Sequence, residues 1–387
     1  MDVSPALITA WARTAVAPQG GAFRHLQTHD LAVPVVHSLL ERAGITAQAV
    51  DAVVLGNALG AGGNPARMLA LAAGLPTPCA TYSVDTQCCS GLDAVSLAVG
   101  LLASGQASVV LAGGVEAWSR SPLRYHRPSQ PGQEAVAYER PAFAPRPEDD
   151  PDLLQSAADY AAQQGISRLQ QDAYAMQSHA RALAHQADLA DEIVPLLGLR
   201  HDPYPRALNS QRAARMPVAA ASPGSDPGQA CGVSSLAISG KADGAALLLL
   251  ATPQACRDLG MAPHAAWVNS VSTGYLPATP LLAAKQATQL LLARSGLHTP
   301  ARVEALELHD AFAVQGLDFC HAFGMDSSRV NRRGGGLARG HPIAASAAVA
   351  LVRVLADLKR DESPGAMGLA TVAGAGGIGS AALVQRL

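Results

Sequence analysis

The sequence predicts an α/β fold made of two similar halves, and three observations point to it. Apolar strand-like segments alternate with amphipathic helical segments near the start, as in parallel sheets that are covered by helices. The last third repeats the order of the first: a reactive side chain, a helix of small residues, a strand and a glycine pair. With 387 residues and 49% hydrophobic side chains, the chain can bury a core larger than that of one small domain.

The elements of the first half follow from hydrophobic periodicity. One face of the segment 30–43 carries Leu31, Val35, Leu39 and Leu40, which predicts an amphipathic helix. The other elements that we expect are a strand at 6–8, a strand at 52–56 stopped by glycine, a helix at 64–73, an extended segment at 81–86, a helix that ends at 102, and a strand at 108–112 that ends in a glycine pair.

The middle of the chain has a different composition. Seven prolines between residues 119 and 152 are expected to break any regular element there. Helices at 153–164 and 168–185 follow, the second with Ser167 as its N-cap, and a second irregular stretch covers 200–227. A strand at 245–251 then returns to the core. The middle is therefore interpreted as an excursion from the core, rich in loops.

The last third is predicted to contain a strand at 305–308, a helix at 344–358 and a strand at 368–373. Residues 374–379 spell the glycine pattern GxGxxG, but the chain ends eight residues later, so neither a helix nor a second strand is expected after it. A dinucleotide site needs both elements. We interpret the segment instead as a turn whose backbone N–H groups bind an oxyanion.

Composition excludes several classes of function. A formal net charge of −2 argues against a nucleic-acid partner. Six cysteines without a CxxC pair or zinc spacing fit a reducing compartment and no metal site. The N-terminus shows no signal-peptide pattern, and no apolar run is long enough to span a bilayer, so we expect a cytoplasmic protein without a membrane anchor.

Cys88 is the first candidate for chemistry. It lies between an extended segment and an Ala/Leu helix, and the start of a helix stabilises a thiolate. The alternative is a buried, inert thiol, which is the commonest role of cysteine. Cys89 is a rival at this level of the argument.

Two histidines are further candidates. His341 lies between a glycine-rich run and Pro342, at the start of a helix, where glycines allow the backbone to approach a ligand. His309 and Asp310 follow a buried strand, and ligands in α/β sheets bind at the carboxyl ends of strands. A structural histidine and a helix-capping Asp310 are the alternatives.

Arginines gather in the proline-rich excursion. They suit either the phosphates of a large anionic ligand or an ordinary solvated loop, and the sequence favours neither. The residues are Arg120, Arg124, Arg127, Arg140 and Arg146.

A series of motifs, in order and at consistent spacing, covers nearly the whole chain and resembles the thiolase superfamily. The motifs are Arg13-Thr14 with Gly20-Gly21, Asn64-Pro65-Ala66-Arg67, Gln87-Cys88-Cys89-Ser90-Gly91, Ala112-Gly113-Gly114-Val115-Glu116 with Ser119 and Pro122, Ile166-Ser167-Arg168 with Gln171-Asp172, Ser239-Gly240-Lys241-Ala242-Asp243-Gly244-Ala245-Ala246, His309-Asp310-Ala311-Phe312-Ala313, Gly340-His341-Pro342 and Gly376-Gly377-Ile378-Gly379.

The resemblance implies a thiolase-like α/β fold, in which two βαβαβαββ halves form five αβαβα layers with an inserted loop domain. The expected boundaries are 1–117 and 242–263 for the N-terminal half, 118–241 for the loop domain, and 264–387 for the C-terminal half. It also implies an acyltransferase of fatty acid metabolism with acyl-CoA and CoA as ligands, no separate cofactor, and a homodimer or homotetramer.

Site residues carry over from the resemblance position by position. The family's nucleophile precedes two small residues and a glycine, which corresponds to Cys88 here, and its Gly-His-Pro histidine is His341, the base. His309 is expected to polarise a thioester carbonyl together with His341. Ser239 matches a position that touches the pantetheine arm of CoA, and the turn at Ala375 and Gly376 is expected to contact substrate.

Two departures from the family pattern concern the chemistry. The His309-Asp310 form resembles the sterol-carrier branch, where many thiolases have Asn-Glu. The second cysteine that moves the substrate α-proton is absent from both known positions, which are Ala373 and Ala311 here, and Cys320 is interpreted as structural.

Three functions therefore stay open at this stage: a thiolase-type acyl-CoA C-acyltransferase with an acyl-cysteine intermediate, a thiolase-like or decarboxylative condensing enzyme that needs no second cysteine, and a non-catalytic subunit. The acyltransferase is favoured. A Cys-His-His trio of Cys88, His309 and His341 also resembles the site of ketoacyl synthases, in which decarboxylation replaces proton abstraction.

Overall fold

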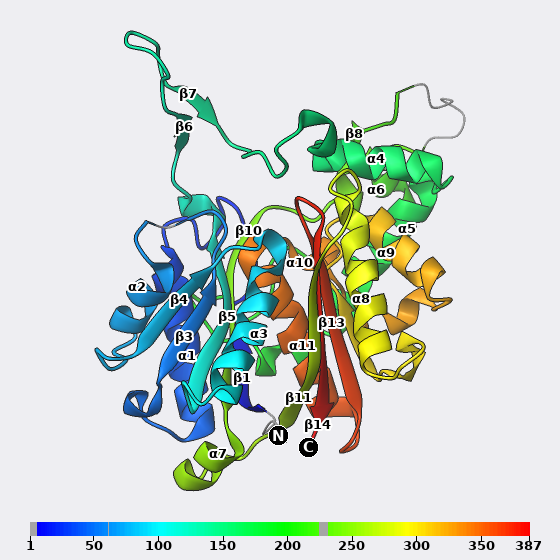
Figure 1. Cartoon of the computed structure of the whole chain (residues 1–387). Helices are drawn as coiled ribbons and strands as arrows, with labels where there is room; N and C mark the ends of the chain where they lie inside the picture. The colour runs from blue at the N-terminus through cyan, green and yellow to red at the C-terminus, as the bar shows by residue number, and fades with distance from the viewer. Residues whose placement is uncertain (1–5, 61, 224–230) are drawn as a thin grey trace.

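The computed structural model describes residues 6–60, 62–223 and 231–387, so residues 224–227 of the irregular stretch expected at 200–227 lie outside the described part. Two halves with the same strand order make up the body (Figure 1). The strands of the first half are β1 (Leu7–Arg13), β3 (Ala52–Gly56), β4 (Ala80–Val84), β5 (Val109–Ala117) and β10 (Ala242–Ala251), and a short β2 (Ala17–Pro18) pairs with β10.

The strands of the second half follow the same pattern. They are β11 (Ala265–Gly274), β12 (Ala305–Leu308), β13 (Met367–Gly374) and β14 (Ile378–Arg386). The order β3-β5-β10-β1 of the first half corresponds to β12-β13-β14-β11 of the second. In both, the first pair is parallel and the next two pairs are antiparallel. The duplicated architecture predicted from sequence is therefore confirmed at the level of strand order and direction.

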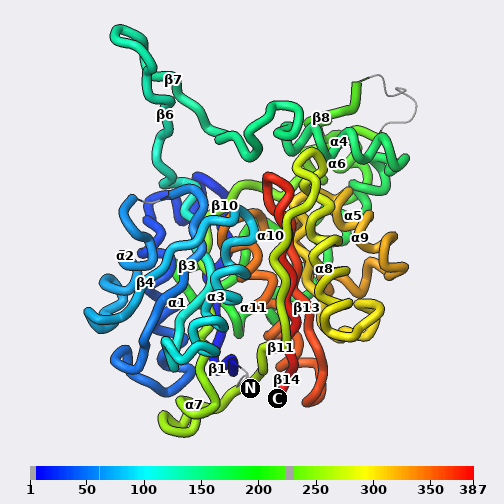
Figure 2. Tube along the Cα trace, viewed as in Figure 1, coloured from blue at the N-terminus to red at the C-terminus, as the bar shows by residue number. Residues whose placement is uncertain are grey.

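The two halves share one continuous sheet that joins at a corner. Leu7 and Ile8 of β1 pair with Ala266 and Ala265 of β11. Figure 2 shows the trace of the first half and that of the second half side by side, with α3 (Ser90–Ala103) and α11 (Ser346–Asp361) between them. Each half thus presents one face of its strands to these two central helices.

Side chains that alternate between the two faces of each strand produce the five layers. On β5, Val110 packs into the central cluster with Leu92 of α3 and Leu351 of α11, while the neighbouring Leu111 packs outward. Successive side chains on a strand point to opposite faces, so one strand serves two cores. The outer helices are α1 (Thr28–Ala43) and α2 (Pro65–Ala72) on the first half, and α8 (Ala283–Arg294) and α9 (Ala313–Ala322) on the second.

The inserted segment forms helices that lie over one end of the body, as Figure 1 shows. They are α4 (Leu153–Gln163), α5 (Arg168–Ala184) and α6 (Ser210–Ala214), with the short strands β8 (Val218–Ala220) and β9 (Val233–Ser234). Ser167 caps α5 as predicted, by accepting the N–H of Gln170. The remaining elements are α7 (Pro253–Leu259) and α10 (Gly336–Arg339). No helix of the described residues is long and apolar enough to cross a membrane.

The stretch 200–227, which was expected to be irregular, contains α6 and β8, so that prediction was wrong. Three further predictions about local structure were also wrong. The proline-rich segment is not devoid of regular structure, because β6 (Arg124–His126) and β7 (Val136–Tyr138) form a hairpin between its prolines. It stands clear of the body in Figure 1. A second strand, β14, does follow the terminal glycines, because positive φ angles of 79° at Gly376 and 74° at Gly377 reverse the chain.

The last of these errors concerns the glycine pair at 113–114, which does not end its strand. β5 runs through both residues to Ala117. A Cβ at Gly113 would lie 2.2 Å from the Ala246 oxygen, and one at Gly114 would lie 2.1 Å from the Ala344 oxygen. These glycines therefore serve close packing against β10 and against the helical turn after His341.

Candidate active site

Cys88 is placed by a strained turn at the start of α3. Gln87, directly before it, has a φ of 53°, a value that a residue with a side chain rarely adopts. Two hydrogen bonds hold the turn: the Gln87 N–H donates to Asp85 Oδ1 at 3.0 Å, and the Ser90 hydroxyl donates to the Gln87 carbonyl at 2.6 Å. Such strain costs about 1–3 kcal/mol and persists where the surroundings enforce it, often at functional sites.

The two neighbouring thiols lie in different surroundings. Cys88 lines two cavities and is partly accessible. Cys89 is fully buried, with its Sγ 3.9 Å from the Val372 oxygen and 3.8 Å from the Ile378 oxygen. Of the two candidates, Cys88 is the thiol that a small molecule in either cavity reaches.

His341 lies beside the Cys88 thiol. Its Nε2 is 3.1 Å from the sulfur, and its Nδ1 is 2.7 Å from the Ser346 hydroxyl. Ser346 Oγ donates to the Pro342 carbonyl, so it accepts the hydrogen bond from Nδ1–H. This network assigns the proton to Nδ1 and leaves Nε2 free to accept the thiol proton.

The backbone around His341 is fixed by close contacts. Its N–H donates to the Gly240 carbonyl at 2.7 Å. Gly340, directly before it, has a φ of 108°, and a Cβ there would lie 3.1 Å from the Ala242 side chain. Glycine at this position therefore lets the histidine loop approach the start of β10.

His309 completes the cluster predicted from sequence. Its ring stacks on that of His341, with centroids 4.4 Å apart and an interplanar angle of 27°. Its Nε2 is buried and has no hydrogen-bond partner among the described residues. Gly336 makes room for the ring, because a Cβ there would lie 2.7 Å from His309 Cε1. An unpaired buried polar atom is costly unless a ligand or water satisfies it.

Burial dominates the protonation of the cluster. It raises the pKa of the Cys88 thiol to about 12, opposed by the backbone N–H groups of Ala375 and Cys88 itself. It lowers the pKa of His341 to about 4, and that of His309 falls well below 6.5 for the same reason, helped by the neighbouring His341. The resting pair is therefore a neutral thiol and a neutral imidazole. Burial of the thiol thus opposes the thiolate that the start of the helix favours.

Two cavities meet at Cys88. The outer one, of about 520 Å³, runs past Leu59, Arg124 and Phe143, and the inner one, of about 270 Å³, runs past Ser239 and Leu281. Both are lined by Cys88, His341, Ala375, Trp118, Asp152, Leu153 and Lys241. Both cavities therefore give access to the thiol.

The other residues predicted for the site are only partly brought together. Ser239 lines the inner cavity, but its hydroxyl already donates to the Gly336 carbonyl at 2.6 Å. Ala375 lines both cavities, whereas Gly376 lines neither and lies against the Phe143 carbonyl. Asp310 does not cap α9, whose N-cap is Phe312.

The positions of the absent cysteine are both at the wall of the inner cavity. Ala373 and Ala311 contribute methyl groups there. Cys320 is buried in the second half among apolar neighbours, as expected for a structural residue. Among the described residues, no group of three or more His, Cys, Asp or Glu side chains is arranged to hold a metal ion.

Sequence reasoning assigned no role to two polar residues that position the site. Ser346 orients His341, and its signal was a hydroxyl within a helix of alanines. Glu116 accepts hydrogen bonds from the Asn57 side chain at 2.8 Å and from the Ala344 N–H at 3.3 Å, so it joins the loop after β3 to the turn after His341. Burial raises the pKa of Glu116 to about 7. An acidic residue in the apolar strand 109–117 was the available signal.

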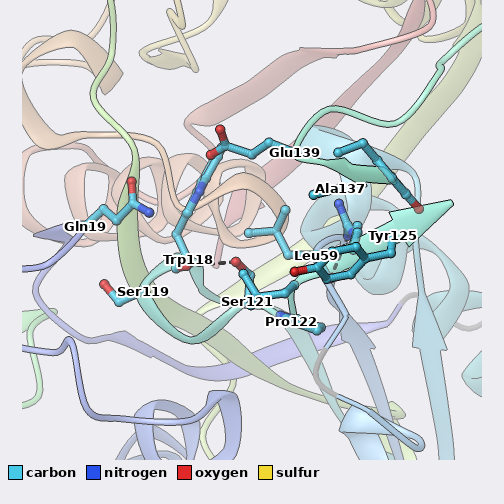
Figure 3. Close-up of a pocket in the computed structure, with 12 residues that line it drawn as sticks. Gln19, Leu59, Trp118, Ser119, Ser121, Pro122, Tyr125, Ala137 and Glu139 are labelled. Carbon is cyan, nitrogen blue, oxygen red and sulfur yellow. Dashed lines mark hydrogen bonds between the residues drawn. The ribbon is translucent and has the colours of Figure 1, made fainter. Parts of the chain in front are cut away.

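The arginines of the excursion differ in their partners. Arg140 pairs with Asp150, and Arg146 with Asp149. Arg124 instead donates to the Leu59 carbonyl at 2.6 Å. It lines both the outer cavity and a third cavity of about 480 Å³ at the base of the hairpin, which Figure 3 shows with Trp118, Tyr125 and Glu139.

Comparison with known proteins gives a consistent family. Residues 6–254 match the model of the thiolase N-terminal domain, and residues 261–386 match that of the thiolase C-terminal domain. The chain belongs to the thiolase family. Bacillus subtilis YhfS is 35% identical over 384 residues, which cover 99% of each chain.

Solved structures of thiolases are similar along the whole chain. The acetyl-CoA acetyltransferase of Bacillus anthracis has a TM-score of 0.89 at 29% identity and covers 100% of this chain and 99% of its own. The Acat5 thiolase of Ascaris suum, in complex with coenzyme A, has a TM-score of 0.89 at 26% identity, with 99% and 100% covered. Membership of this family makes the chain a thiolase-type acyltransferase.

Proposed function

We propose that this thiolase-family chain transfers acyl groups from CoA thioesters to carbon through an acyl-Cys88 intermediate, without a separate cofactor. The contact of 3.1 Å between Cys88 Sγ and His341 Nε2, at the junction of two cavities, carries the proposal. The coenzyme A bound to the Ascaris suum thiolase supports a CoA thioester as the ligand.

In the first half-reaction, His341 accepts the Cys88 proton as the sulfur attacks the thioester carbonyl. The tetrahedral oxyanion forms near the Cys88 and Ala375 backbone N–H groups, which already favour a negative charge on the sulfur. Collapse breaks the bond to the CoA sulfur, and imidazolium returns the proton to that sulfur. Because thiol and imidazole start neutral, the proton moves during the attack and no ion pair forms beforehand.

In the second half-reaction, the α-carbon of a second thioester attacks the acyl-Cys88 carbonyl. His309 polarises the carbonyl of this thioester, and its unpartnered Nε2 acquires a hydrogen-bond partner in this way. The new carbon–carbon bond forms as the bond from carbon to the Cys88 sulfur breaks. Nε2 of His341, neutral again after the first half-reaction, accepts the α-proton during the attack and returns it to the Cys88 sulfur.

A decarboxylative condensation is the second candidate, and the methyl groups of Ala373 and Ala311 at the inner cavity favour it. Loss of CO₂ from a malonyl thioester produces the same α-carbanion without a base at either position. Loss of a general acid/base typically costs about 10²–10⁴-fold in a reaction that needs one.

Two assays on the purified protein separate the candidates. Thiolysis of acetoacetyl-CoA by CoA, abolished in Cys88→Ala, is expected for the C-acyltransferase. Release of CO₂ from malonyl-CoA with condensation, in the absence of thiolysis, supports the second candidate. A protein that does neither and forms no acyl adduct is the non-catalytic subunit, and both enzymatic proposals are then wrong.

We propose that the chain forms a homodimer or homotetramer through the free edge of β4. Among the described strands, β4 pairs with β3 alone. Exposed apolar side chains lie on and beside it, namely Tyr82 (45% exposed) and Met68 (46%). Such an edge readily pairs with another chain. Light scattering that gives the mass of one chain would contradict this proposal.

A further inference from the structure

We propose that the acyl group accepted at Cys88 carries a terminal carboxylate, which Arg124 recognises. This inference rests on the proposed acyl-Cys88 function and specifies its substrate class. It starts from the outer cavity, because the inner cavity contains Ser239, the position expected to contact the pantetheine arm. An acyl group on Cys88 would then extend away from Ser239 and into the outer cavity.

Two of the three cations that line the outer cavity form ion pairs, and its two other carboxylates accept hydrogen bonds. Lys241 Nζ lies 2.7 Å from Glu139, and Arg140 pairs with Asp150. Asp152 caps α4. Asp85 accepts hydrogen bonds from the Gln87 backbone and side chain. Among the cations that line this cavity, Arg124 is therefore the one without a carboxylate partner, and Asp85 and Asp152 have no cationic partner among the described residues.

Arg124 has no carboxylate within ion-pair distance in the part of the chain that the structure describes. Its hydrogen bonds go to the carbonyls of Leu59 at 2.6 Å and Ala58 at 3.5 Å, both from one terminal nitrogen. A guanidinium has five N–H donors, so donors remain for a ligand. Their geometry suits bidentate binding of a carboxylate.

The surroundings of Arg124 suit a substrate with an apolar chain and a charged end. Leu59, Trp118 and Phe143 line the outer cavity between Cys88 and the hairpin. The cavity beyond, drawn in Figure 3, adds Tyr125 and space of about 480 Å³. The combined space exceeds what an acetyl group needs. A dicarboxylic acid linked to its carrier through one end fits this distribution of apolar and cationic groups.

The test compares the rate of Cys88 acylation for pairs of thioesters by intact-protein mass spectrometry. Succinyl, glutaryl and adipyl thioesters are each paired with the terminal carboxamide of the same length. N-acetylcysteamine serves as the carrier, because it has no phosphate that Arg124 could bind instead. We expect the charged member of at least one pair to react about 10–100-fold faster, the effect of a hydrogen bond to a charged group.

Variants assign this preference to one side chain. Arg124→Gln is expected to slow acylation by the carboxylate thioester to the rate of the carboxamide thioester, whose own rate should not change. Arg124→Lys is expected to keep part of the preference for the carboxylate thioester. Arg127→Gln is the control, because Arg127 is exposed on the same hairpin and lines none of the three cavities described above.

Several outcomes would overturn the inference. Equal rates in the wild type exclude carboxylate recognition while leaving the acyl-Cys88 function intact. Equal slowing of both thioesters in Arg124→Gln makes Arg124 an anchor of the hairpin. If Arg124→Gln lowers the rate of Cys88 acylation by CoA thioesters but not by N-acetylcysteamine thioesters, Arg124 binds a CoA phosphate instead. No acylation by any thioester refutes the underlying function as well.

Discussion

At the residue scale, the central feature is a thiol and an imidazole that are both neutral at rest. Ser346 holds the proton on Nδ1 of His341, so Nε2 can accept the proton of Cys88. This differs from sites in which a stable thiolate waits for substrate. Reagents that react with thiolates should therefore modify Cys88 slowly.

The pKa of Cys88, raised to about 12 by burial, predicts slow alkylation by iodoacetamide at neutral pH. The rate should be below that of free cysteine, whose pKa is about 8.5, and should keep rising with pH through the alkaline range. Stopped-time mass spectrometry of the Cys88 peptide measures it. Fast alkylation that is constant between about pH 5 and pH 9 would reveal a preformed ion pair instead.

The absent second cysteine makes Ala373→Cys a gain-of-function test. The new thiol would lie at the wall of the inner cavity, where it can exchange the α-proton of a substrate. Thiolysis of acetoacetyl-CoA should rise by up to about 10²–10⁴-fold, the usual contribution of a general acid/base. Ala370→Cys, buried on the same strand in the central cluster, is the control and should change nothing. No gain in Ala373→Cys would show that the site does not use this position.

At the scale of elements, the site depends on how closely α3 and α11 approach each other. Gly91, three residues after the thiol, faces the start of α11: a Cβ there would lie 2.6 Å from the Ala344 oxygen and 2.9 Å from the Ala348 side chain. The absence of a side chain therefore lets the elements that carry Cys88 and His341 come together.

Gly91→Ala should destabilise the protein by about 1–3 kcal/mol, the usual effect of overpacking, and lower activity further by moving Cys88 from His341. Gly100→Ala is the matched control in the same helix, with nothing within 4 Å of its added Cβ. It should stabilise the helix by up to about 1 kcal/mol. Urea unfolding measures both, and equal effects of the two variants would contradict the packing argument.

The helices and strands show what the sequence could and could not predict. The periodicity of the α1 segment and the apolar run of β3 gave their boundaries within two residues, because local pattern determines them. The hairpin at β6 and β7, the passage of β5 through its glycines and the return strand β14 were missed. Each depends on a partner distant in sequence, such as Ala246 opposite Gly113, which local pattern does not contain.

For the candidate site, the sequence identified the residues but not their environment. Cys88, His341 and His309 do lie together, and the motif order predicted this. The raised pKa of Cys88 was not predicted, because the desolvation of its thiol depends on every element packed around it. Ser346 and Glu116 were assigned no role, since a hydroxyl in a helix and a carboxylate in a strand are informative only once their partners are known.

At the scale of the whole molecule, a buried ionic cluster connects the inserted segment to both halves. Glu192 lies between Arg13 of β1 and Arg353 of α11, and all three side chains are at most 1% exposed. Arg13 also pairs with Asp202 at 2.7 Å. The inserted segment, which contributes Leu153 and Ser239 to the site, is thereby tied to the body.

Glu192→Gln should lower the free energy of unfolding by about 3–5 kcal/mol, because it leaves buried arginines short of a partner. The two arginines lower the pKa of Glu192 in the folded protein despite its burial. Its contribution is therefore present above its unfolded pKa of about 4.5 and disappears as pH falls through the lower folded value. In urea titrations, the difference in the free energy of unfolding between wild type and Glu192→Gln should therefore become smaller as pH falls.

Glu139→Gln is the control for this experiment, since Glu139 pairs with Lys241 with its side chain 78% exposed. An exposed pair contributes at most about 1 kcal/mol. A Glu192→Gln protein as stable as this control would show that the cluster does not hold the inserted segment in place.

The most direct measurement is intact-protein and peptide mass spectrometry after brief incubation with acetyl-CoA. The account predicts one acetyl group on the peptide that contains Cys88, retained in Cys89→Ser, absent in Cys88→Ala, and formed about 10²–10⁴-fold more slowly in His341→Ala. An acetyl group that persists in Cys88→Ala, or a wild-type protein that acquires none, would contradict it.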